Sequence, residues 1–152
     1  MQYKVEDIKK LREETGAGVL EVKQALDKFE GDTNAAKSML MKKVSAKAAK
    51  KADRVAGDGL VVTYIHNGGK MGSLVLVACE TDFVAKTQDF QDLSKNIAMQ
   101  VCTEDYESVD QLLSSEFIKD PTKKISEIIE EVIAKVGEKI EIKKFVKYSI
   151  DD

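Results

Sequence analysis

The most constraining feature of this sequence is a change of hydrophobic period near its middle, where two apolar runs flank a glycine-rich turn. The runs are LVVTYIH at 60–66 and MGSLVLVAC at 71–79, with NGGK between them. Such residues favour strands, and an Asn-Gly pair between the runs predicts a β-hairpin, because type I′ turns need positive φ at their corners. Apolar residues before the hairpin recur at helical spacing instead. We therefore expect an α+β fold.

The first part of the chain, residues 1–43, predicts three short helices. The segment TGAG at 15–18 interrupts the helical pattern, Gly31 ends the second helix, and Asp32 or Thr33 can cap the third. The residues expected to face inward are Val5, Ile8, Leu11, Val19, Val22, Ala25, Leu26, Phe29, Ala35, Ala36, Met39 and Leu40. We expect a small three-helix domain here, with little core of its own.

Residues 44–58 are expected to form a basic linker. The basic residues in and beside it are Lys42, Lys43, Lys47, Lys50, Lys51 and Arg54. We interpret the segment as a solvated, alanine-rich helical linker rather than a nucleic-acid-binding arm, because it has no aromatic residues that could stack on bases. The net charge of the whole chain is also −3. Nucleic acid is therefore not expected as a partner, and contact with RNA through the linker is a minor alternative.

Residues 59–152 predict the α+β core. A helix should follow the hairpin, and a further short helix is expected at 108–113. Pro121 stands where the next helix could begin, and Gly137 ends it. The apolar faces of the two longer helices are Phe90, Leu93, Ile97, Ala98 and Val101, and then Ile125, Ile128, Ile129, Val132 and Val136. KIEIKKFVKYSI at 139–150 adds a strand with a possible bulge near Lys143 and Lys144. This predicts a three-stranded antiparallel sheet covered by helices.

The composition excludes several classes of protein. Hydrophobic residues make up 43% and charged residues 34% of the chain, which is typical of a soluble globular protein. No apolar run approaches the roughly 18 to 20 residues of a membrane span. The segment MQYKVEDIKK lacks a hydrophobic signal, so we expect a cytoplasmic protein without membrane contact. Two cysteines without CxxC spacing and a single histidine predict neither a metal site nor a disulfide.

Thr81, Asp82, Phe83 and Val84 follow the second apolar run and allow two interpretations. In the first, Asp82 caps the following helix and Phe83 packs beneath it. In the second, Phe83 projects from the end of a stiff sheet into a partner protein. Loops on rigid scaffolds often carry recognition residues, and aromatic side chains often dominate interface energies. The residues alone leave both interpretations open.

His66 and Cys79 suggest a thiol or histidine hydrolase only weakly. Cys79 lies in an apolar run, and no oxyanion-hole or orienting motif accompanies it. His66 stands at the expected turn, where a surface histidine is common. Gly68 and Gly69 form too short a pair for a phosphate-binding loop. We therefore expect no enzyme and no cofactor.

Several segments occur together in an order that characterises one protein family. They are LREETGAGVLEVKQAL at 11–26, EGDTNAAKSML at 30–40, TDFVAK at 81–86 followed by Phe90, and AKVGEKIEIKKF at 134–145. The first two resemble the ubiquitin-associated-like amino-terminal domain of bacterial translation elongation factor Ts. TDFVAK resembles its nucleotide-exchange motif, and the last segment resembles its closing helix and strand.

The resemblance implies a guanine-nucleotide exchange factor that promotes GDP release from elongation factor Tu during translation elongation. It implies that Asp82 and Phe83, in the stretch Thr81 to Val84, intrude into the GTPase near its magnesium and phosphate site. It also implies that Leu11, Arg12, Val19, Leu20 and His66 contact the same GTPase.

Longer members of this family have two core modules and a helical hairpin, whereas this chain has room for one module. The resemblance therefore implies a homodimer in which one subunit presents Phe83 and the other presents His66. An alternative function is a ubiquitin-like-binding or nascent-chain-associated adaptor, which the amino-terminal helices alone would also fit.

Overall fold

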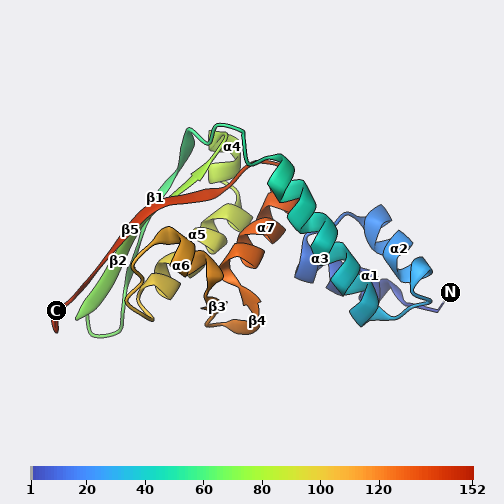
Figure 1. Cartoon of the computed structure of the whole chain (residues 1–152), viewed down its shortest axis with the longest axis horizontal. Helices are drawn as coiled ribbons and strands as arrows, with labels where there is room; N and C mark the ends of the chain where they lie inside the picture. The colour runs from blue at the N-terminus through green and yellow to red at the C-terminus, as the bar shows by residue number, and fades with distance from the viewer. Residues whose placement is uncertain (1) are drawn as a thin grey trace. The chain divides into compact units, whose positions relative to one another are not determined.

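A computed structural model describes residues 2–152, which divide into two compact units (Figure 1). The first unit holds the chain up to Asp53 together with Glu130–Gly137. The second holds Arg54–Ile129 and Glu138–Asp152. Helix α7 (Ile125–Val136) thus begins in the second unit and ends in the first. The expected division into residues 1–43, 44–58 and 59–152 concerns independent folding and stays a prediction.

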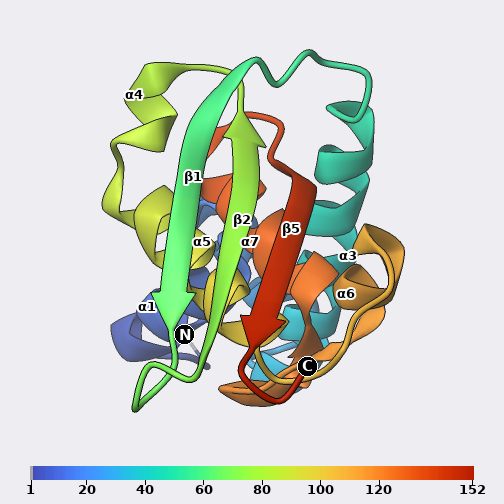
Figure 2. The same cartoon turned by 90° about the vertical axis from the view of Figure 1, so that its left-hand side faces the viewer.

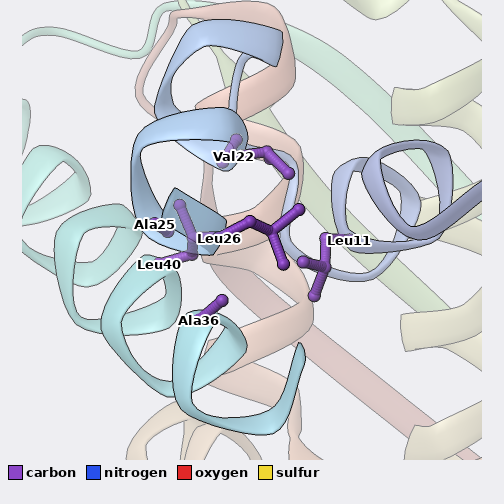
Figure 3. Close-up of a cluster of buried hydrophobic side chains, with 7 residues drawn as sticks. Leu11, Val22, Ala25, Leu26, Ala36 and Leu40 are labelled. Carbon is purple, nitrogen blue, oxygen red and sulfur yellow. The ribbon is translucent and has the colours of Figure 1, made fainter. Parts of the chain in front are cut away.

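The first unit contains the three expected helices, α1 (Val5–Thr15), α2 (Val19–Lys28) and α3 (Thr33–Lys50). Asp32 caps α3 by accepting hydrogen bonds from the backbone N–H groups of Asn34 and Ala35. Their shared core, part of which Figure 3 shows, consists of Leu11, Ala17, Val22, Ala25, Leu26, Ala36 and Leu40. Helix α3 continues to Lys50 and buries Val44, so the first half of the expected linker is helical.

The second unit contains the expected three-stranded antiparallel sheet, with strand order β1-β2-β5. The strands are β1 (Asp58–Ile65), β2 (Met71–Cys79) and β5 (Glu141–Ser149), and Figure 2 shows them side by side. The expected bulge is confirmed, because Leu76 pairs with Lys144 while Val77 pairs with Ile142, which leaves Lys143 without a partner position.

The hairpin is confirmed, but its turn differs from the expected one. Asn67 does not adopt positive φ. The left-handed residues are instead Gly68 and Gly69, with φ of 86° and 72°. His66 accepts a hydrogen bond from the Gly69 N–H and donates its own N–H to the Met71 carbonyl. A longer loop replaces the two-residue type I′ turn, because glycine adopts positive φ more readily than asparagine does.

Helices cover one face of the sheet (Figure 1). The main one is α5 (Gln88–Val101), whose expected apolar face is buried, and the short α4 (Asp82–Ala85) and α6 (Val109–Ser114) lie nearby in sequence. The predicted helix start at Pro121 is wrong. Pro121 lies in β4 (Asp120–Lys124), which pairs with β3 (Glu116–Phe117). A two-stranded ribbon has only edge strands, and these tolerate proline.

Within residues 2–152, no helix combines the length and the apolar character that crossing a bilayer would require.

Candidate functional site

Phe83 belongs to the one-turn helix α4. Figure 2 shows this helix beside the end of β2. The Phe83 side chain is 83% exposed, whereas the neighbouring Val84 and Ala85 are buried. Thr81, and not Asp82, is the N-cap residue, and its hydroxyl accepts a hydrogen bond from the Val84 N–H. The interpretation in which Asp82 caps the helix and Phe83 packs beneath it is therefore wrong. The geometry instead places an aromatic ring in solvent.

The buried half of α4 explains why the ring points outward. Val84 and Ala85 occupy the side of the single turn that faces the unit's interior, so the adjacent Asp82 and Phe83 face away from it. Asp82 forms an ion pair with Lys86 at 3.4 Å, and both side chains are largely exposed. Such an exposed pair contributes little to stability. Helix α4 and its C-cap residue Lys86 thus expose a carboxylate, a phenyl ring and an ammonium group to solvent.

Glu138 holds the turn that precedes α4. Its carboxylate accepts hydrogen bonds from the N–H groups of Glu80 and Thr81, at 3.1 and 3.0 Å, and from the Thr81 hydroxyl, at 2.7 Å. Sequence reasoning missed this residue, because it stands 57 positions after Thr81. Only the pairing of β2 with β5 could have revealed it.

Cys79 is a protonated, buried thiol. It is fully enclosed at the end of β2, and its Sγ contacts the Thr81 carbonyl at 3.1 Å. Burial, followed by the nearby Glu138 and Asp58 carboxylates, raises the pKa of this thiol to about 11. A hydrolase nucleophile needs a lowered pKa and access to substrate. The residue therefore lacks both requirements.

His66 lies at the hairpin turn, whereas Cys79 ends β2 and Phe83 follows it at the other end of the strands. Figure 2 shows the hairpin turn and α4 at opposite ends of the sheet. Strand β2 has nine residues, so its ends are about 26 Å apart at ~3.3 Å per residue. The His66 side chain is exposed, and its Nδ1 lies 3.3 Å from the Tyr64 hydroxyl. His66 and Cys79 thus form no catalytic pair within this chain.

The amino-terminal candidates divide into buried and exposed residues. Leu11 is only 2% exposed and belongs to the helical core (Figure 3). Arg12 is exposed on α1, and Val19 and Leu20 are 41% and 68% exposed on the first turn of α2. The exposed residues are accessible to a partner in this conformation, whereas Leu11 packs in the core of the three helices.

No cluster of three or more histidine, cysteine or acidic side chains suited to a metal ion occurs in residues 2–152. The acidic side chains around α4 have other partners. Glu138 accepts hydrogen bonds from backbone N–H groups, and Asp82 forms an ion pair with Lys86. What this part of the surface presents is an exposed phenyl ring beside an exposed ion pair.

Comparison with known proteins gives one consistent family. A family model described as elongation factor TS matches residues 80–152. A protein named elongation factor Ts from Moorella thermoacetica is 39% identical over 191 aligned positions, which cover 96% of this chain and 94% of the relative. The namesake from Petrotoga mobilis is 36% identical over 197 positions, with both chains covered completely.

Longer relatives match over part of their length. The elongation factor Ts of Nostoc sp. is 44% identical over 145 residues, which cover 95% of this chain and 46% of the relative. This chain therefore spans about half of the length of such relatives, and nearly all of the shorter ones.

Proposed function

The chain belongs to the elongation factor Ts family, and from this premise we propose that it is a guanine-nucleotide exchange factor for elongation factor Tu. It acts in translation elongation and forms or breaks no covalent bond itself. The observation that carries the proposal is the position of Phe83, an exposed phenyl ring on a turn that is held by hydrogen bonds. TDFV, residues 81–84, is the contact segment, with Asp82 and Phe83 entering the GTPase.

Exchange follows from linkage between two binding equilibria. The exchange protein binds the nucleotide-free GTPase more tightly than the GDP-bound form. It must therefore lower the affinity of the GTPase for GDP by the same ratio by which GDP lowers the affinity of the GTPase for the exchange protein. Moving a two-state equilibrium from mostly closed to mostly open needs about 5.5 kcal/mol of differential affinity. Burying one phenylalanine supplies only about 1.5 to 3 kcal/mol. Phe83 therefore requires further contacts that hold the two proteins together.

The amino-terminal helices supply such contacts in this proposal. Arg12, Val19 and Leu20 form an exposed group with a charge and two apolar side chains, and Leu11 keeps the helices together beneath them. Apolar side chains that are exposed in the free protein gain free energy when a partner covers them. We assign anchoring on elongation factor Tu to this group.

We also propose that the protein acts as a homodimer. Phe83 and His66 lie at opposite ends of the same hairpin, so one subunit cannot bring both to neighbouring points on a GTPase. The sheet face opposite α5 is rich in exposed apolar side chains, which favours its burial against a second copy. These side chains include Val61, Ile65, Leu74 and Tyr148. In the dimer, one subunit presents Phe83 and the other presents His66.

The proposed setting is the cytoplasm, where elongation factor Tu works. The proposal needs no cofactor, membrane or nucleic acid. In this proposal, the basic residues of α3 and of the segment after it lie in a solvated linker between the two units. Lys47 forms an ion pair with Glu21 inside the first unit, so not all of this charge is available to an RNA backbone.

The direct test is the release of a fluorescent GDP analogue from purified elongation factor Tu, followed with and without this protein. We expect release to accelerate with increasing concentration of the protein and to reach a plateau. Unlabelled GDP with magnesium should compete with formation of the complex. Release that is indifferent to the protein at micromolar concentration would overturn the proposal.

A further inference from the structure

We propose that Glu138 is the positioning residue for Phe83, and that its carboxylate fixes the turn from which the exposed ring projects. Its effect on exchange rests on the function proposed above, but its effect on the ring does not. Glu138 touches neither the ring nor any partner group in this proposal. It acts through Thr81, which it contacts at both the backbone N–H and the hydroxyl.

The sheet register brings Glu138 to this place. Ala78 of β2 is paired with Glu141 of β5 in an antiparallel ladder. Thr81 comes three residues after Ala78, and Glu138 comes three residues before Glu141. Because the strands are antiparallel, Thr81 and Glu138 lie opposite each other. The ladder hydrogen bonds end there, and the carboxylate replaces them by binding two successive N–H groups, those of Glu80 and Thr81. Charge-assisted hydrogen bonds of this kind are stronger than neutral ones.

The hold passes from Glu138 to α4 through the Thr81 side chain. The Thr81 hydroxyl donates a hydrogen bond to Glu138 Oε2 at 2.7 Å. This bond directs the lone pairs of the hydroxyl oxygen toward the Val84 N–H, from which the oxygen accepts a hydrogen bond at 3.4 Å. The Thr81 carbonyl meanwhile lies 3.1 Å from Cys79 Sγ and accepts the Ala85 N–H at 3.3 Å. Every polar group of Thr81 is thus engaged, so the turn has one favoured arrangement.

The ring needs this external support. A helix of four residues is too short to be stable by its own hydrogen bonds. Phe83 makes little packing contact that could fix it, since it is exposed, and the Asp82–Lys86 pair beside it is exposed as well. A contact residue that is ordered before binding loses less conformational entropy when the complex forms. Glu138 therefore determines how well the ring is prepared for its partner.

The first experiment measures the order of the turn without any partner. The chain contains no tryptophan, so Phe83→Trp introduces a single tryptophan, which can be excited at wavelengths that the four tyrosines do not absorb. Time-resolved anisotropy of this variant is compared with that of Phe83→Trp combined with Glu138→Ala. We expect Glu138→Ala to add a fast depolarisation phase. In the chain with native Phe83, we expect Glu138→Ala to speed amide hydrogen exchange of Glu80 and Thr81 by about tenfold or more.

A conservative variant and a matched control sharpen this experiment. Glu138→Gln keeps one oxygen for the two N–H donors, so its anisotropy and amide exchange should lie between those of the native chain and Glu138→Ala. If Glu138→Ala lowers the thermal unfolding midpoint so far that the variant is not folded at the temperature of the measurement, Glu138→Gln takes its place in both measurements. Glu141→Ala removes a carboxylate from the same segment, where it pairs with Lys139 instead, and should leave both readouts unchanged. Native-like ring order and amide exchange in both Glu138 variants would overturn the inference.

The second experiment measures exchange on elongation factor Tu with Phe83 intact. Glu138→Ala should lower the plateau rate of GDP release by about tenfold, Glu138→Gln should recover part of it, and Glu141→Ala should match the native protein. A loosened turn with an unchanged plateau rate would overturn the link between positioning and exchange. If the native protein itself fails to release GDP, the proposed function fails, while the anisotropy and amide-exchange results still decide the role of Glu138.

Discussion

Phe83 and Phe90 are the same residue type seven positions apart, and the fold gives them opposite roles. Phe90 is completely buried in α5 and contributes to the core, whereas Phe83 is 83% exposed. An exposed aromatic residue of this size gains about 1.5 to 3 kcal/mol if a partner covers it. The phenyl ring at position 83 is thus accessible to solvent.

We predict that Phe83→Ala leaves the free energy of unfolding within about 0.5 kcal/mol of the native value, because the side chain makes little internal contact. The plateau rate of GDP release from elongation factor Tu should fall about tenfold or more, which corresponds to the loss of one buried ring. Stopped-flow fluorescence and denaturant titration measure the two quantities.

The matched control for this variant is Phe90→Ala, which we expect to lower the free energy of unfolding by about 3 to 5 kcal/mol by opening a cavity. If Phe83→Ala destabilised the fold as much as Phe90→Ala does, the assignment of Phe83 to recognition would be refuted.

We predict that Cys79 reacts slowly with thiol reagents in the folded protein. Burial raises its pKa to about 11, so at pH 8 only about one thiol in a thousand is ionised. The half-buried Cys102 should react first, and exchange activity should survive a stoichiometric amount of reagent. Mass spectrometry of the labelled peptides identifies the site. Rapid labelling of Cys79 would contradict a buried thiol with a raised pKa and would favour the alternative of a thiol hydrolase.

At the scale of elements, the hairpin and the bulge set where the site residues lie. The loop with Gly68 and Gly69 reverses the direction of the chain. The bulge at Lys143, which has no partner in β2, shifts the pairing register of β5 by one residue. Gly59 makes a further demand, since its φ is 139° and an added Cβ would stand 2.2 Å from the Val77 carbonyl oxygen. The start of β1 thus depends on the absence of a side chain.

We predict that Gly59→Ala lowers the free energy of unfolding by about 1 to 3 kcal/mol, because the backbone of β2 must move away. Gly57→Ala is the matched control, since no atom lies within 4 Å of its added Cβ and its φ is not in the left-handed range. Guanidinium titration of both variants measures the difference. Equal stabilities of the two variants would show that the Val77 carbonyl leaves room for a Cβ at position 59.

At the scale of the whole molecule, the two compact units share α7, because residues 130–137 belong with the amino-terminal helices. Deleting residues 1–43 would therefore remove most of the first unit and leave the end of α7 without its partners. Substitutions on exposed residues test the proposed anchoring more cleanly than such a deletion does.

We predict that Leu20→Asp raises the concentration of protein that gives half-maximal GDP release and leaves the plateau rate nearly unchanged, since it weakens anchoring and not the Phe83 contact. Val55→Asp, at another exposed apolar position, serves as the control. A concentration series of GDP-release rates separates the two parameters. A lowered plateau with unchanged half-saturation would assign Leu20 a different role.

We predict a dimer mass by light scattering at micromolar concentration. Tyr148→Glu places a charge on the exposed apolar sheet face and should yield monomers, because burying an unpaired carboxylate is unfavourable. Circular dichroism checks that the fold persists. A monomer mass for the native protein would exclude the proposed arrangement of Phe83 and His66 from two subunits.

The sequence by itself determined the types and order of most elements. Helical spacing marked α1, α2, α3 and α5, the glycine-rich turn marked the hairpin, and the slip near Lys143 marked the bulge. It failed at Pro121, where strand pairing outweighed a local helix signal. These features depend on neighbouring residues, so local patterns carry them.

Only the tertiary structure decided which side chains meet and which stay exposed. It brought Glu138 to Thr81 across 57 positions, buried Leu11, and left Phe83 in solvent while it enclosed Phe90. Apolar spacing identifies a face but not what covers it, because covering depends on chain segments distant in sequence. The accessibility of Phe83 and its support by Glu138 are therefore products of the folded chain, and not of the TDFV stretch alone.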